Sequence, residues 1–219
     1  FRSTQSRDSQ NINKKLEDHV KHCLPSDAYF EIPLMDTSDV ATALMNLSPK
    51  KARGLDGLDV KYLQMVCGLI SKPLSNIFNL SIKTKQFPEV WKCAKVTPIF
   101  KSGCNMKCGN YRPISILSSL SKILEKHVHN SFYDFLTKYG LLCSCQSGFR
   151  KDHSCETCLV EMLNTWYKML DDGNLVGAVM LDMKKAFDLV DHDLLLSKLS
   201  TYHCSTDTVH WFKSYLSDR

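Results

Sequence analysis

The sequence lacks a hydrophobic run long enough to cross a membrane and shows no secretion signal. Its longest apolar run, Leu175 to Leu181, falls far short of the ~18 apolar residues that a membrane-spanning helix needs. The chain also lacks a phosphate-binding Gly-x4-Gly-Lys-Ser/Thr loop and a Gly-rich dinucleotide fingerprint. These absences argue against a membrane protein, a P-loop nucleotidase and a dinucleotide-dependent enzyme. We expect a protein of the nucleus or cytoplasm that is not secreted.

The ten cysteines are many for an intracellular chain but few for a disulfide-stabilised scaffold of this length. Without a secretion signal they are predicted to be reduced thiols. Zinc is the alternative, because Cys155 and Cys158 form a Cys-x-x-Cys near His153, and Cys104 and Cys108 form a looser pair. A structural zinc site takes four ligands, usually as two tight pairs, and no second tight pair is evident. Free thiols are therefore favoured over zinc.

Charge is distributed unevenly along the chain, although the net charge is only +5. Residues 91–155 carry 10 basic and 3 acidic side chains, whereas residues 156–219 carry 6 basic and 10 acidic ones. A basic middle beside an acidic end is typical of a protein that holds a polyanion in one place and metal ions in another. An unevenly charged, solvated surface is the alternative, and charge alone leaves both interpretations open.

The size of the chain allows one large domain or two small ones, and 43% hydrophobic residues can form a sizeable core. The chain begins with Phe1 rather than methionine, and it ends at Arg219 within a helical pattern. We therefore expect it to be a piece of a longer protein.

The spacing of apolar residues predicts a helix-rich α/β (α+β) fold. Helices are predicted over residues 11–24, 38–47, 59–85 with an interruption near Pro73, 120–136, 156–170, 193–202 and 207–216. Ser38 and Asp39 are the predicted capping residues of the second helix. Strands are predicted over residues 95–101 and 111–117, which would form a hairpin with a basic tip. A third strand over residues 175–183 has a continuous apolar run, which predicts a central strand covered on both faces.

The stretch LDMKKAFDLVDHDLLLSKL places Asp182 at the end of that third strand. A carboxylate there is costly unless it is hydrated, paired or bound to a metal. Mg²⁺ takes a few protein carboxylates and completes its shell with waters and phosphates, and two such ions can organise a phosphoryl transfer. A helix cap or a solvated loop is the simpler explanation of an isolated aspartate. Asp188 is interpreted as a cap or as a partner of Lys185, while Asp191 and Asp193 are predicted to cap the next helix.

The pattern D-x-x-K-A-F-D-x-V-x-H-x-x-L-x-x-K-L, read from Asp182 to Leu199, resembles motif A of reverse transcriptases. It is most similar to those of jockey-like retrotransposons without long terminal repeats. Three earlier stretches resemble the preceding finger motifs of that family in the same order. They are WKCAKVTPIFKSG from Trp91, NYRPISIL from Asn110 and QSGFRKDHSCET from Gln146. KKARGLDGL, from Lys50, resembles the segment that leads into the polymerase.

The resemblance implies roles for individual residues. Asp182 would be a catalytic aspartate that binds Mg²⁺, with the backbone carbonyl of Met183 as a further ligand. Phe187, beside Ala186, would lie under the sugar of the incoming nucleotide and exclude a 2′-hydroxyl. Lys101 and Arg112 would hold the triphosphate. The residues implied in supporting the template strand are Gln146, Gly148, Phe149 and Arg150. Core packing of the phenylalanines and an ordinary basic hairpin are the alternatives.

The resemblance also implies a right-hand polymerase fold with an RNA template, a DNA primer and deoxynucleotides as partners. The expected domains are a lead-in over 1–29, a helical extension over 30–90, fingers over 91–174 and the start of a palm over 175–219. Two departures from the family pattern stand out. Cys155 replaces a usual threonine, and the chain contains no Tyr-x-Asp-Asp hairpin after Asp182 to complete the two-metal site. We therefore expect the isolated chain to be inactive.

Two other interpretations compete with a polymerase fragment. The chain could be a catalytically dead relic that only binds nucleic acid through residues 91–155. It could also be an inert remnant that does not fold stably. Salt-dependent nucleic-acid binding would distinguish these two.

Overall fold

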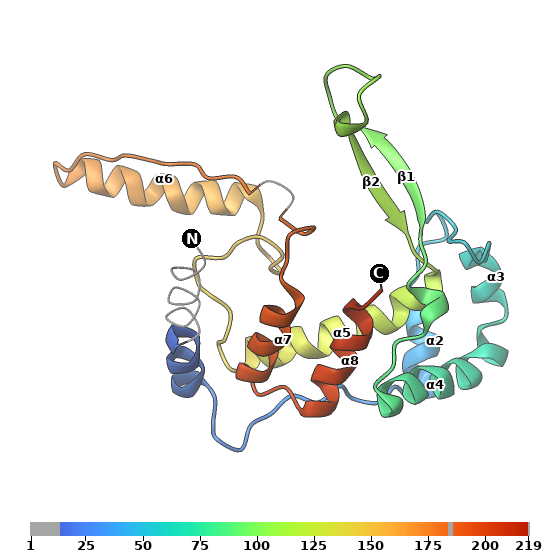
Figure 1. The fold of residues 1–219 in the computed structure, drawn as a ribbon. Helices are drawn as coiled ribbons and strands as arrows, with labels where there is room; N and C mark the ends of the chain where they lie inside the picture. The colour runs from blue at the N-terminus through green and yellow to red at the C-terminus, as the bar shows by residue number, and fades with distance from the viewer. Residues whose placement is uncertain (1–13, 184–185, 219) are drawn as a thin grey trace.

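The computed structural model describes residues 14–183 and 186–218, and it is helix-rich with one small sheet. The helices are α2 Thr37–Met45, α3 Val60–Met65, α4 Cys67–Thr84, α5 Ser119–Lys138, α6 Cys155–Asp171, α7 His192–Thr201 and α8 Thr206–Leu216. Residues 14–23 are also helical. The strands are β1 Lys95–Phe100 and β2 Tyr111–Ile116. In Figure 1 the helices α2, α4, α5, α7 and α8 form a base from which the β1–β2 hairpin and α6 project.

The predicted hairpin is confirmed. Strands β1 and β2 pair antiparallel, with Lys95 opposite Ile116 and Phe100 opposite Tyr111. Pro98 lies opposite Pro113. Because the described sheet has two strands, neither proline removes a hydrogen bond to a further neighbouring strand. In the described part of the chain these two strands form the whole sheet, which leaves both of their outer edges open.

The helices agree with the predicted ones except at two boundaries. Helix α2 is capped by Asp36 rather than by Ser38 or Asp39, and Asp39 instead completes the capping box from the third helical position. The predicted break near Pro73 is wrong, because α4 runs through this proline and the helices separate at Val66. Burial of Leu74 and of other side chains on the same face of α4 outweighs the hydrogen bond that a proline removes.

The core lies where α4, α5 and α8 meet. Trp211 of α8 is 1% exposed, and its indole N–H donates to Ser81 Oγ at 3.1 Å. Phe87 packs edge-on against Trp211 and Tyr215, with ring centroids 5.6 Å and 5.0 Å apart. Edge-to-face aromatic pairs add to the free energy of burying these large side chains. The C-terminal helix is therefore an integral part of the core.

The segment around Phe30 joins the start of the described chain to its end. Phe30 accepts a backbone hydrogen bond from Ser205 and donates one to His203, forming a parallel bridge beside Cys204. Its ring packs 5.0 Å from that of Phe132 in α5. The two backbone bonds connect segments more than 170 residues apart, and the ring contact joins this region to α5.

The predicted central strand over residues 175–183 is wrong for this structure. The segment follows α6 without any strand hydrogen bonding, and its apolar side chains are open to solvent, with Leu175 97% and Leu181 91% exposed. A central strand of a sheet needs hydrogen-bonded partners on both edges, and a buried one needs packing on both faces. In residues 14–183 and 186–218 the two other strands pair with each other, so this segment has no partner.

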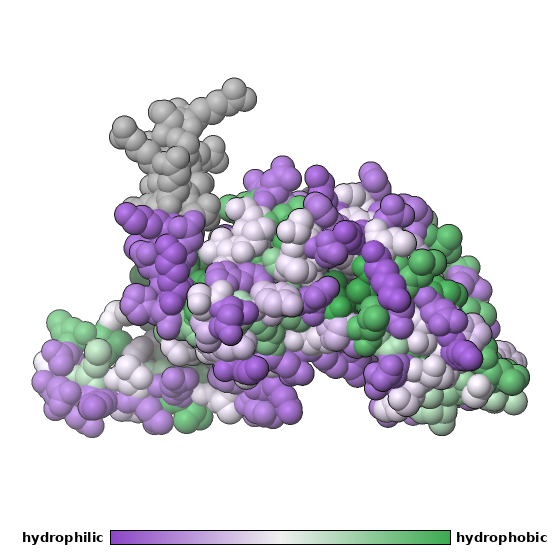
Figure 2. Space-filling view, turned by 90° about the horizontal axis from the view of Figure 1, so that it is seen from below, coloured by the Kyte–Doolittle hydropathy of each residue, from purple (hydrophilic) through white to green (hydrophobic). Residues whose placement is uncertain are grey.

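The surface mixes polar and apolar side chains. Figure 2 shows apolar surface toward its right edge, the side on which α3 and α4 lie. Met65 of α3 and Leu69 of α4 are each 80% exposed. Among the described residues no helix combines the length and apolarity needed to cross a membrane.

Candidate functional site

The hairpin presents Lys101 and Arg112 on one face. Arg112 lies opposite Ile99, and Lys101 extends the pairing by donating its backbone N–H to Asn110 O at 2.8 Å. Because side chains alternate along a strand, Lys101 shares a face with Ile99 and therefore with Arg112. The two residues are diagonal neighbours across the hairpin, a relation in which the Cα atoms are about 7–8 Å apart. Both side chains are exposed, and neither forms an ion pair within the described residues. The two cations are therefore available to an anion from solution.

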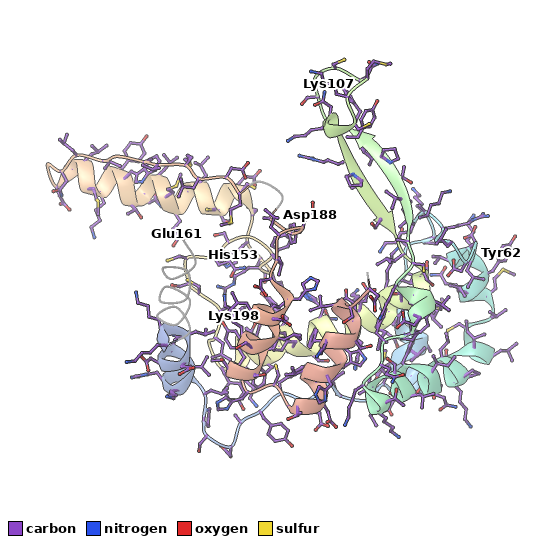
Figure 3. The ribbon with its side chains drawn as sticks, viewed as in Figure 1. Tyr62, Lys107, His153, Glu161, Asp188 and Lys198 are labelled. Atoms are coloured by element: carbon purple, nitrogen blue, oxygen red, sulfur yellow. The ribbon has the colours of Figure 1, made fainter. Side chains whose placement is uncertain are left out.

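The tip of the hairpin is held by its own polar contacts. Asn110 donates from its side chain to Cys104 O at 2.7 Å, and the Tyr111 hydroxyl donates to Asn105 O at 2.9 Å. Gly103 has φ +89°, and a Cβ there would lie 2.9 Å from the Asn110 side chain, so the turn requires glycine. Figure 3 shows Lys107 at this tip, far from the helical base.

The base of the hairpin packs against the turn over residues 53–57. Asp56 accepts a hydrogen bond from Ser118 Oγ at 2.6 Å, where β2 leads into α5. Gly54 lies so close to this junction that a Cβ would be 2.9 Å from Ser118 N. Nearby, burial and then repulsion from Lys51 lower the pKa of Lys122. The sequence indicated a turn here but not its contact with the hairpin, because nothing local in KKARGLDGL predicts its partner.

The loop after α5 turns Arg150 inward and Phe149 outward. Arg150 Nη1 donates to Cys143 O at 2.9 Å, and its Nε is buried without a hydrogen-bond partner in the described structure. Gln146 donates its side-chain N–H to Gly148 O at 3.0 Å, which closes the loop on itself. Phe149 has φ +60° and is 85% exposed. The loop thus exposes the ring of Phe149 to solvent, while the side chains of Gln146 and Arg150 form hydrogen bonds within the loop.

The ring of Phe149 meets that of Phe187. The ring centroids are 6.0 Å apart and the planes are at 89°, an edge-to-face pair. Phe187 itself is 78% exposed, and Ala186 beside it is also exposed. The structure therefore brings together two segments that the sequence singled out separately.

Asp182 and Met183 lie on the exposed segment that precedes this aromatic pair. Both are open to solvent, and Met183 is 80% exposed. The carboxylate and the backbone carbonyl are oxygen donors of the kind that Mg²⁺ takes. Within the described residues no three His, Cys, Asp or Glu side chains gather closely enough to hold a metal ion. Within residues 14–183 and 186–218, no ion pair joins Asp182 to Lys101 or Arg112.

The three later aspartates differ in position. Asp191 caps α7, since its side chain accepts from Leu194 N at 3.0 Å, which confirms that prediction. Asp193 lies in the first turn of α7, where a negative charge is favourable, but it is not the cap. Asp188 is exposed in the preceding turn, as Figure 3 shows, and caps no helix. Its suggested partner, Lys185, lies outside the described residues.

None of the ten cysteines forms a disulfide. Cys204 is buried, and desolvation raises the pKa of its thiol to about 12, so it is protonated and unreactive at neutral pH. Cys155 and Cys158 are both exposed at the start of α6. A cavity of about 480 Å³ is lined by these two cysteines and by side chains that include His153 and Phe149.

Comparison with known proteins identifies the same segments. Residues 99–219 match the family described as "Reverse transcriptase (RNA-dependent DNA polymerase)". The chain is 34% identical over 182 residues to the "Probable RNA-directed DNA polymerase from transposon BS" of Drosophila melanogaster. This similarity covers 83% of the chain and 20% of the relative.

Other relatives are RNA-directed DNA polymerases named for mobile elements of the same fly. The chain is 30% identical to the "RNA-directed DNA polymerase from mobile element jockey", with 82% of the chain and 20% of the relative covered. It is 27% identical to the "Probable RNA-directed DNA polymerase from transposon X-element", with 94% and 22% covered. The chain thus spans about a fifth of the length of these relatives.

Proposed function

Because this chain belongs to the reverse transcriptase (RNA-dependent DNA polymerase) family, we propose that it forms the fingers and the first part of the palm of a retrotransposon enzyme that copies RNA into DNA. The observation that carries the proposal is the match over residues 99–219, which includes Lys101, Arg112, Phe149 and Asp182. In this proposal the fingers cover residues 91–174, after a helical extension. The primer 3′-hydroxyl attacks the α-phosphorus of a deoxynucleotide, and pyrophosphate leaves.

The hairpin would hold the triphosphate of the incoming nucleotide. Support comes from Lys101 and Arg112, which share one exposed face and have no anionic partner among the described side chains. The guanidinium of Arg112 can donate two parallel hydrogen bonds to phosphate oxygens, while Lys101 acts as a point charge. Such positioning and charge stabilisation account for most of the catalysis in phosphoryl transfer.

The aromatic pair would form the wall beside the sugar and the template. Phe187, next to Ala186, would exclude a 2′-hydroxyl by its bulk. Phe149 would support the template strand together with Gln146, Gly148 and Arg150. The edge-to-face contact between Phe149 and Phe187 supports this assignment, because it brings the template-supporting loop next to the nucleotide-binding segment.

Magnesium would bind at Asp182. Its carboxylate and the Met183 carbonyl fit the oxygen preference of Mg²⁺, which commonly takes one or two protein carboxylates and fills its remaining positions with water and substrate phosphates. Bound there, the ion would stabilise the charge that develops on the transferred phosphoryl group. Asp182 would hold it from an exposed position that a triphosphate can reach.

The test is primer extension by a polymerase that carries this segment in its full length. Asp182→Asn should abolish incorporation of deoxynucleotides on an RNA template, because the amide removes the metal-binding charge. Asp188→Asn is the matched control, since this aspartate is also exposed but has no role in the proposal, and it should retain activity. Full activity of Asp182→Asn would refute the proposed function. The 219-residue chain alone should show no extension.

A second candidate is a chain that only binds nucleic acid through residues 91–155. The exposed hairpin with its lysines favours it. Binding of this kind weakens steeply with salt, because it releases counterions from the phosphate backbone. Tight, salt-sensitive binding by a full-length protein that is inactive with intact Asp182 would favour this candidate over the polymerase.

A further inference from the structure

Two exposed thiols lie in the first turn of α6. Cys155 is the first residue of this helix, and Cys158 follows three residues later. We propose that Cys155 and Cys158 form a reversible dithiol–disulfide site that exchanges with low-molecular-weight disulfides of the glutathione disulfide class. Neither cysteine has a role in the proposed function, although the cavity that they line also includes Gly148 and Phe149 of the template-supporting loop, and the proposal does not depend on polymerase activity.

Helix geometry brings the two thiols close to bonding distance. Side chains three positions apart on a helix have Cβ atoms about 5–6 Å apart. A disulfide needs a Cβ separation of about 3.5–4.5 Å, with Cα atoms that can be as far as ~6.8 Å apart. Closure therefore requires the two Cβ atoms to approach by about 1–2 Å, a local tightening of one turn.

The first turn of α6 can tighten because little holds it rigidly. No residue of α6 is buried, so no core packing opposes a shift. The turn is organised by the capping box of Ser154 with Thr157 and by the backbone bond from Cys158 N to Ser154 O at 3.1 Å. The N–H groups at a helix start have no partner within the helix, so tightening breaks few other bonds.

The space around the two thiols suits a small disulfide. The cavity of about 480 Å³ is lined by both cysteines together with His153, Phe149, Leu159 and Met162. Figure 3 shows His153 where the chain enters α6. A bulky adduct on one thiol would occupy this cavity beside Phe149, whereas an internal disulfide would release the adduct and leave the space open.

The exchange runs in two balanced steps. The thiolate of one cysteine attacks a sulfur of the external disulfide RSSR, which breaks its S–S bond and releases RS⁻. The thiolate of the second cysteine then attacks the first cysteine's sulfur, forms the Cys155–Cys158 bond and releases the second RS⁻. The dithiol loses two electrons and RSSR gains them. The two thiol protons pass through solvent to the two released thiolates, giving two RSH.

The digest of the 219-residue chain offers a direct readout. Trypsin cuts after Lys151 and Lys168, so both cysteines fall in one peptide, residues 152–168. Cleavage after Lys138 and Arg150 places Cys143 and Cys145 in another peptide, residues 139–150, which serves as an internal control. Those two thiols are also exposed, but they are not in a helix and are only two positions apart.

The chain is equilibrated with mixtures of reduced and oxidised glutathione, alkylated and digested, and the masses of the peptides are measured by mass spectrometry. Oxidised peptide 152–168 should lack two hydrogens and carry no alkyl groups. It should reach half oxidation at a ratio of oxidised to reduced glutathione about tenfold lower than the ratio that the control peptide needs. In Cys158→Ser a glutathione adduct should accumulate on Cys155, and in Cys155→Ser on Cys158. Dithiothreitol should restore all thiols.

Three results would overturn the proposal. The first is equal oxidation of the two peptides at every ratio. The second is a peptide 152–168 that stays fully alkylated. The third is accumulation of glutathione adducts on the unmutated pair, which would mean that neither thiol displaces an adduct from the other.

Discussion

Replacing Gly54 with alanine should loosen the base of the hairpin. The added Cβ would lie 2.9 Å from Ser118 N and 3.0 Å from Leu117 C. Both are backbone atoms at the junction of β2 and α5, so they cannot rotate away as a flexible side chain can. The turn must then move by several tenths of an ångström, which also lengthens the hydrogen bond between Asp56 and Ser118. Overpacking of this kind costs about 1–3 kcal/mol of unfolding free energy.

Urea unfolding of the 219-residue chain, followed by circular dichroism, measures that cost. Gly68→Ala is the matched control, because a Cβ there meets nothing within 4 Å and the residue lies in α4. It should stabilise the chain by up to about 1 kcal/mol through helix propensity and a less flexible unfolded state. Adding Asp56→Ala should cost less in the Gly54→Ala background than in the unmutated chain. Equal stability of Gly54→Ala and the unmutated chain would refute the close contact.

Two more changes test the hairpin and the core. In the full-length polymerase, Arg112→Ala should raise the KM for deoxynucleotides much more than the Kd for primer–template, and Lys95→Ala should not; an equal loss of both would refute a triphosphate contact. The pKa of Cys204 is raised from 9.0 to about 12, so the native state keeps a proton that the unfolded state loses. The free energy of unfolding should therefore fall as pH rises from about 9 towards 12. In Cys204→Ala, measured by urea unfolding, the part of this fall that comes from the thiol should be missing.

Local sequence signals predicted most elements correctly. The hairpin follows from two short runs that flank a polar connection with Gly103 and Gly109, and α5 follows from apolar residues at helical spacing ending at Gly140. These signals suffice because the interactions that form such elements lie within a few residues. The Asp191 cap is of the same kind, since the donor is three residues away.

Contacts between distant segments were not predictable from the sequence. The bridge at Phe30 pairs it with Cys204, and nothing in either stretch marks the other as a partner. The contact of Gly54 with the hairpin and the ring contact of Phe149 with Phe187 likewise join separate segments. Such pairings depend on how whole elements pack, so a single sequence predicts the participants better than the pairs.

The cap of α2 was displaced for a local reason. Asp36, Ser38 and Asp39 are all good capping residues, and sequence alone cannot rank them. The structure uses Asp36 because Asp39 then lies at the third helical position, where it can complete a capping box. The competition among equivalent residues, rather than a wrong helix, accounts for the difference.

The apolar run of residues 175–183 is the point at which sequence and structure differ most. Its composition suits a buried strand, yet Leu181 and Val179 are 91% and 85% exposed. Exposing so many large apolar side chains is costly, at roughly 25 cal/mol per Å². Since the chain spans about a fifth of its relatives' length, we propose that the partner strands come from parts of the polymerase outside these 219 residues.

Hydrogen exchange can test this origin of the partner strands. In the 219-residue chain the backbone amides of residues 176–181 have no strand partner, so they should exchange rapidly. In a longer polymerase that contains the same segment, pairing on both edges should slow their exchange strongly, while the amides of α5 should change little. Rapid exchange of residues 176–181 in an active longer polymerase would contradict the proposal. Asp182 would then act from a mobile segment, and a metal site would have to be ordered by the substrate instead of by a sheet.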